Sequence, residues 1–138
     1  MAWRSMSAVV LGLILWIFLF FVIGIGIGQV SPEYREAARL MLQESDMSGF
    51  GTPQLLLNFL LFVIAGLFVG WLATMVGRNR VPAIVLSVSF LIVMMINHYI
   101  LEWDSFPAWY NIVVPFAISI SIAAGSQIRK VQAGFVTH

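Results

Sequence analysis

The chain has 138 residues, of which 61% are hydrophobic and only 9% carry a charge, with a formal net charge of +1. About a quarter of the residues of a soluble domain are charged, so this composition excludes a water-soluble globular protein. The sequence contains no cysteine, which excludes disulfide bonds, thiolate metal sites and thiol redox chemistry.

Four long stretches without charge predict an all-α integral membrane protein. They are Ser5–Pro32, Met47–Gly77, Val81–Leu101 and Ser105–Ile128. Each can hold the roughly 20 apolar residues that cross about 30 Å of hydrocarbon. We therefore predict one domain over residues 1–138, an antiparallel bundle of four transmembrane helices. These helices cover about residues 7–28, 53–76, 82–101 and 107–128, and residues 29–52 form an outer loop.

The basic residues predict which side of the membrane each end of a helix faces. Threading the helices alternately places five on one side: Arg4, Arg78, Arg80, Arg129 and Lys130. The other side receives Arg35, Arg39 and all six acidic residues. The positive-inside rule therefore predicts cytoplasmic termini, in a multi-pass protein of the cell membrane, with a bacterial inner membrane as the expected location.

The first predicted helix has a second interpretation as a secretory signal peptide, because Arg4 precedes its apolar run. That run, residues 8–27, exceeds the roughly 7–15 residues of a signal core, and no A-x-A cleavage site ends it, so we expect a retained helix. Gly24 and Gly28 share one face of its outer half. This spacing fits either close approach of another helix or a flexible helix end.

The outer loop contains the signature of a short helix. Ser31 and Pro32 predict its start, with Glu33 in the first turn, where the helix dipole favours an anion. Its apolar side would carry Tyr34, Ala37, Ala38, Met41 and Leu42. This pattern predicts an amphipathic helix lying on the outer membrane surface or across the top of the bundle. It fits an interfacial connector better than a ligand-binding lid.

Small residues recur at helical spacing in the second and fourth predicted helices. They are Gly66, Gly70, Ala73 and Gly77 in the second helix, and Ala117, Ser121 and Gly125 in the fourth. The hydrophobic effect does not join helices in lipid, so such stripes usually mark close van der Waals packing. We predict that each stripe contacts a neighbouring helix, in this chain or in another.

Polar residues gather at the outer ends of the predicted helices. They are Asn58, Asn97, His98, Glu102 and Asn111, interleaved with aromatic residues. All reach a similar depth, so they could share a pocket beneath the outer loop. They also fit an ordinary interfacial belt in contact with water and headgroups. His98 and Glu102 have the spacing of two metal ligands, but two ligands do not make a metal site, so we expect none.

The central and inner parts of the predicted helices contain no ionisable residue. A proton-coupled transporter needs a buried carboxylate or histidine, so that class is disfavoured. His98 lies too near the surface and too far from a second ligand to bind haem. No Ser/His/Asp or paired-carboxylate arrangement supports hydrolysis. We therefore expect no enzyme, no bound cofactor and no nucleic-acid partner.

The length and the four-helix layout resemble the small fluoride-channel and small multidrug-transporter families. Gly51–Asn58, continued through Gly66 and Gly70, is similar to a fluoride-channel span. That family's glycine-arginine signature and its third span rich in phenylalanine and threonine are missing, as is the drug transporters' first-span glutamate. The chain more closely resembles small four-helix bacterial inner-membrane proteins of unassigned function, through its long outer loop and the segments Gly70–Ala73 and Pro107–Asn111. This resemblance implies a fold but no mechanism.

The sequence supports two hypotheses about function. The first is a non-catalytic accessory or assembly subunit that acts through helix packing, with another membrane protein or a second copy as its partner in the bilayer. The small-residue stripes and the lack of buried ionisable groups favour it. The alternative is a homo-oligomeric channel or facilitator for a small solute. It would use Asn58, Asn97, His98 and Asn111 at an outer vestibule.

Overall fold

The computed structural model describes residues 2–44, 49–101 and 103–128, whose regular structure is entirely helical. The α-helices are α1 (Ala2–Val30), α2 (Pro32–Glu44), α3 (Thr52–Gly77), α4 (Val81–Ile96) and α5 (Ala108–Gly125). A π-helical turn, η1 (Asn97–Leu101), continues α4, and a 3-10 turn, η2 (Trp103–Ser105), precedes α5. Four helices are long and apolar enough to cross a membrane, which confirms the prediction of an all-α chain with four such helices. They are compatible with an integral membrane protein.

α2 occupies the segment where the sequence predicts an amphipathic helix. The Ser31 side-chain oxygen accepts a hydrogen bond from the Tyr34 backbone N–H at 3.2 Å, which is the geometry of an N-cap. Tyr34 and Ala37 are buried, whereas Glu36 and Arg39 are exposed. α2 therefore turns its apolar side toward the other helices and its charged side outward.

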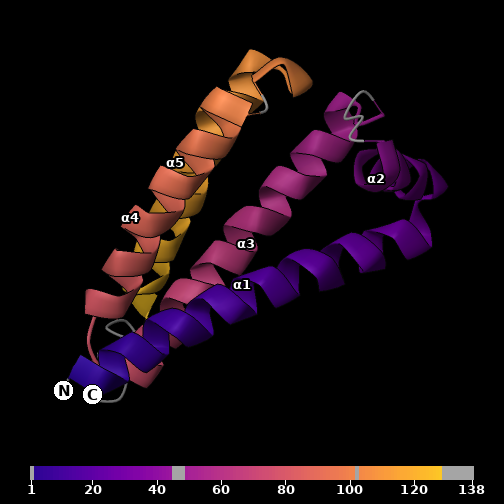
Figure 1. Ribbon diagram of the computed structural model, residues 1–138. Helices are drawn as coiled ribbons and strands as arrows, with labels where there is room; N and C mark the ends of the chain where they lie inside the picture. Colours follow the sequence, from indigo (N-terminus) through magenta and orange to yellow (C-terminus); the bar gives the residue numbers. More distant parts are fainter. Residues whose placement is uncertain (1, 45–48, 102, 129–138) are drawn as a thin grey trace.

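α3 contacts each of the other three long helices, and α4 packs along α5. Figure 1 shows that α1 crosses these helices at an angle and diverges from α4 and α5 toward the end that carries α2. The half of α1 next to α2 is correspondingly open, since a Cβ atom added at Gly24 or Gly26 would meet no other atom within 4 Å.

α3 and α5 approach each other closely through small residues. A Cβ atom on Gly66 would overlap the Ser121 hydroxyl oxygen, and one on Gly70 would overlap the carbonyl oxygen of Ile122. From the other side, a Cβ atom on Gly125 would overlap the carbonyl oxygen of Leu67. Side chains this small let two helix backbones meet, and here the meeting takes place within one chain.

The first half of α1 packs against the turn between α3 and α4. A Cβ atom on Gly12 would lie 2.5 Å from the Leu86 Cδ1 atom. Gly77, at the end of α3, lies against Pro82 of α4 and Ala8 of α1. This end of the molecule is therefore tightly packed, in contrast to the half of α1 next to α2.

Candidate functional site

A cavity of about 710 Å³ lies in the region where α1 diverges from the other helices. α1 forms one wall, α2 lies over it, and η1 and α5 contribute the opposite wall together with α3. Its lining residues are Trp16, Phe20, Phe21, Ile23, Gly24, Ile25, Gly28, Gln29, Tyr34, Arg35, Ala38, Arg39, Met41, Gln43, Phe50, Asn58, Phe62, Met94, Asn97, His98, Phe106, Tyr110, Val114 and Ile118. The volume falls within the roughly 300–1,000 Å³ of small-molecule sites.

Three aromatic side chains, the aromatic floor (Trp16, Phe20 and Phe62), lie at the end of the cavity opposite α2. The Phe20 and Phe62 rings stack with centroids 5.8 Å apart and an interplanar angle of 16°. The Trp16 ring lies 5.9 Å from Phe62 and packs edge-on against Phe90 of α4 at 4.8 Å. These contacts join α1, α3 and α4, and they give the deep part of the cavity an apolar surface.

A buried hydrogen bond fastens α2 over the cavity. The Tyr34 hydroxyl donates to the Asn58 Oδ1 atom of α3 at 2.8 Å, and both residues are buried. Burial raises the pKa of the Tyr34 hydroxyl, and the hydrogen bond with Asn58 opposes part of that rise. The phenol is therefore held in its neutral form, and its hydroxyl proton points toward the Asn58 Oδ1 atom.

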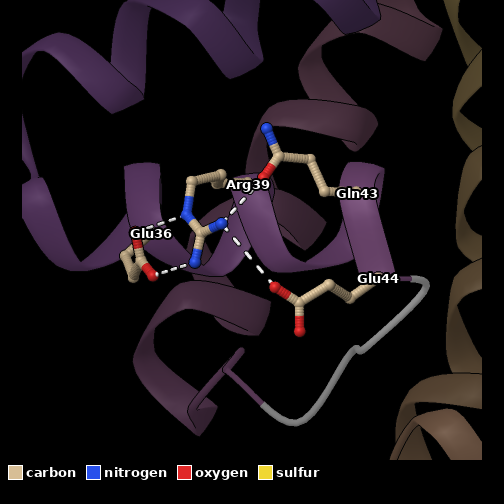
Figure 2. Close-up of polar contacts among 4 residues, drawn as sticks. All are labelled: Glu36, Arg39, Gln43 and Glu44. Atoms are coloured by element: carbon tan, nitrogen blue, oxygen red, sulfur yellow. Dashed lines mark hydrogen bonds and ion pairs between the residues drawn. The ribbon is translucent and has the colours of Figure 1, made fainter.

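α2 carries a cluster of polar and charged side chains around one arginine, shown in Figure 2. The Arg39 guanidinium donates to both carboxylate oxygens of Glu36, at 3.0 Å and 2.7 Å, and to the Gln43 Oε1 atom at 2.7 Å. The Glu44 Oε1 atom lies 3.7 Å from the Arg39 Nη1 atom. The hydrogen bonds that Arg39 donates to Glu36 lower the pKa of Glu36 and raise the pKa of Arg39. Arg39 is thus paired with an acidic residue of its own helix, and its side chain also borders the cavity.

Arg35 closes the junction between α1 and α2. Its Nε atom donates to the carbonyl oxygen of Gly28 at 2.8 Å, which satisfies an orphan carbonyl near the C-terminal end of α1. Gly28 lies against the Arg35 side chain, 3.8 Å from its Cβ atom. Among the described residues, the charged residues that line the cavity are Arg35 and Arg39.

The turn η1 places a buried histidine at the cavity wall. His98 is 5% exposed, and its Nδ1 atom lies 2.9 Å from the Oδ1 atom of Asn111, which is fully buried in α5. The Asn111 Nδ2 atom donates to the carbonyl oxygens of Trp103 and Phe106, at 2.8 Å and 3.1 Å. Asn111 therefore joins η1, η2 and the start of α5.

The polar residues singled out in the sequence lie mainly around this cavity. Asn58, Asn97 and His98 line it, and Asn111 lies behind His98 without lining it. Glu102 lies outside the described residues. Within the described residues, no three side chains of His, Asp or Glu gather into a group that could hold a metal ion.

The predicted small-residue positions fall into two groups. Gly66, Gly70, Ser121 and Gly125 belong to the contact between α3 and α5, Gly77 lies against α1 and α4, Ala73 is buried in α3, and Ala117 is half-buried in α5. In α1, by contrast, a Cβ atom at Gly24, which borders the cavity, would meet no atom within 4 Å, and the atoms nearest to one at Gly28 belong to Arg35 of α2.

Sequence reasoning did not identify the aromatic floor. Trp16, Phe20 and Phe62 lie in runs of apolar residues in which any side chain could face lipid. The only available signal was indirect, because the polar residues mark the outer end of a pocket but not its apolar depth. Comparisons of the chain with protein-family models, with curated proteins and with solved structures find no match.

Proposed function

We propose that this chain is a non-catalytic, multi-pass membrane protein that holds one apolar, lipid-like molecule in the cavity beneath α2. The single observation that supports this proposal is the cavity itself, with about 710 Å³ of space lined mostly by aliphatic and aromatic side chains. Small-molecule sites have this character, an apolar lining with a few placed polar groups.

The proposed ligand enters from the bilayer, where acyl chains are already surrounded by hydrocarbon. Transfer of an apolar chain from lipid into the cavity therefore gains little from the hydrophobic effect. Binding would depend on fit against the aromatic floor and on the polar groups near α2, including Asn58 and His98. Such a site selects a ligand by shape and by its polar end.

The membrane orientation that we propose follows the basic residues. Arg4, Arg78 and Arg80 belong to the tightly packed end of the molecule, and the acidic residues of α2 belong to the other. The positive-inside rule then favours cytoplasmic termini and a cavity in the outer leaflet, in a bacterial inner membrane.

The geometry gives less support to an accessory subunit or a channel. The Gly66 and Gly70 stripe meets α5 within the chain, so it supplies no argument for a partner helix. Trp16 and Phe62 of the aromatic floor lie at the end of the cavity opposite α2. The cavity therefore gives no argument for a pore through the chain.

A matched pair of glycine substitutions tests the proposal. Gly24 lines the cavity and Gly26 does not, yet a Cβ atom would be unobstructed at either position. Native mass spectrometry of protein purified in mild detergent should detect one bound lipid-like molecule per chain in the wild type and in Gly26→Phe. Gly24→Phe, which fills the cavity, should lose it. A wild-type protein without a bound molecule, or a Gly24→Phe variant that keeps it, would contradict the proposal.

A further inference from the structure

One ring nitrogen of His98 has no hydrogen-bond partner among the described residues. Its Nδ1 atom is engaged with Asn111, and its Nε2 atom makes no hydrogen bond to any described residue. The side chain is 95% buried in a wall of the cavity (5% exposed). Among the described residues, the buried side-chain atoms without a hydrogen-bond partner are Gln54 Oε1, Trp71 Nε1 and Arg80 Nη2. His98 Nε2 is not one of them, so it keeps some accessible surface at the cavity wall. A ligand that covered Nε2 without a hydrogen bond would bury an unpartnered acceptor, which is costly.

The hydrogen bonds of Asn111 determine which protonated form of His98 is present. The Asn111 Nδ2 atom donates to two backbone carbonyl oxygens, so its Oδ1 atom is the one that faces His98. An amide oxygen only accepts, and the His98 Nδ1 atom must therefore carry the proton. In the neutral imidazole, Nε2 is then an acceptor with a free lone pair.

The backbone around His98 supports a role in binding. η1 widens the helix from α to π geometry at Asn97–Leu101, the stretch that contains His98. Short π-helical turns inside α-helices are rare and frequently occur at functional sites. Here the turn places Asn97 and His98 together on the cavity lining.

We infer that the ligand is a neutral amphiphile whose polar end carries a hydroxyl or N–H group, and that His98 Nε2 accepts a hydrogen bond from that group. This inference rests on the proposed function. A pure hydrocarbon would leave the Nε2 atom unpartnered, and a carboxylate or phosphate would need the imidazole to take a second proton before Nε2 could donate to it. In an apolar chain that ends in a hydroxyl, the hydroxyl can donate to Nε2 while the chain packs against the aromatic floor.

Two probes with the same alkyl chain, one ending in a hydroxyl donor and the other in a methoxy group, test the inference. Purified full-length protein in detergent is loaded with radiolabelled 1-hexadecanol, which is then displaced with unlabelled 1-hexadecanol or with its methyl ether. Because the ether cannot donate, we expect half-displacement of the label to need about five to ten times more ether than alcohol. In His98→Phe this ratio should fall to about one. The control Tyr99→Phe, which changes an exposed neighbour outside the cavity, should keep the wild-type ratio.

The outcomes separate the inference from the function beneath it. Equal displacement by alcohol and ether in the wild type, with binding that Gly24→Phe abolishes, would overturn the role of His98 and leave the cavity function standing. No retention of hexadecanol by the wild type would overturn both. If His98→Phe does not fold, the comparison of the two probes on the wild type decides the question.

Discussion

Two hydrogen-bonded pairs of buried polar side chains join different elements. Tyr34 of α2 meets Asn58 of α3, and His98 of η1 meets Asn111 of α5. Each pair satisfies groups that lie away from water, where an unpartnered donor or acceptor costs about 1–3 kcal/mol. The pairs therefore hold α2 against α3 and η1 against α5, where Asn58 and His98 line the cavity.

The Tyr34–Asn58 pair leads to a prediction about how firmly α2 is held. Tyr34→Phe removes one hydrogen bond worth about 1 kcal/mol, so cleavage of α2 by an alkaline protease at pH 8 should rise about fivefold. The pKa of Tyr34 is raised in the docked state, so its contribution is complete below the ordinary value of about 10 and is lost as the pH rises through the raised pKa. Wild-type cleavage should therefore increase at strongly alkaline pH.

The same experiment contains its controls. Tyr34→Phe should show no further increase above pH 10, because it has no hydroxyl to ionise. Tyr99→Phe should behave like the wild type, since Tyr99 is an exposed residue that is not part of this pair. A variant whose cleavage equals that of the wild type at pH 8 would show that this hydrogen bond does not hold α2.

The sequence singles out several of these residues but not which residue pairs with which. Depth along the predicted helices singled out Asn58, His98 and Asn111. Tyr34 was assigned only to the apolar side of α2, because its pairing with Asn58 depends on how α2 folds back over α3. The partner of a buried polar group lies across space, and one sequence records only spacing along the chain.

At the scale of helices, the small residues of α3 and α5 make a contact that tolerates little change. Gly70→Leu would put a side chain where the backbone of Ile122 stands, and overpacking of this kind costs about 1–3 kcal/mol or more. We expect the thermal unfolding midpoint in detergent, followed by tryptophan fluorescence, to fall by several degrees. Gly26→Leu adds the same side chain to an open helix face and should leave the midpoint unchanged. Equal midpoints for the two variants would rule out a tight contact at Gly70.

The elements differ in how much of their packing the sequence reveals. α2 alternates charged and apolar faces, so its buried side, with Tyr34 and Ala37, follows from periodicity. α1 and α3 are apolar on every side, so periodicity cannot show which face of either helix packs against the others. Small residues recover part of that information for α3, through Gly66 and Gly70. For α1 they do not identify a contact within the chain, because a Cβ atom at Gly24 would meet no atom within 4 Å.

For the whole molecule, the absence of charge over four long stretches was enough to predict four membrane-length helices. It could not predict that α1 diverges from the others, because that angle depends on contacts such as those of Gly12 and Trp16 at one end of the helix. The cavity results from this divergence, so its polar rim was predictable and its volume was not.

The proposed orientation gives a prediction for the intact protein in its membrane. Fusions that end after Asn79 should place their reporter in the cytoplasm, and fusions that end after Gln43 should place it outside. Green fluorescent protein should therefore be fluorescent only after Asn79, and alkaline phosphatase active only after Gln43. The reverse pattern would show the opposite orientation, with the cavity in the inner leaflet.

The unequal lengths of the helices connect the cavity to the thickness of the bilayer. α1 has 29 residues and α5 has 18, which correspond to about 43 Å and 27 Å of helix. A long apolar helix matches a thin hydrocarbon layer by tilting. In a thick membrane α1 would stand more upright and its outer half would approach α5, so the space beneath α2 would narrow. Hydrophobic mismatch would thus set the width of the cavity, and lipids of different chain length would bind to differently sized sites in the same protein.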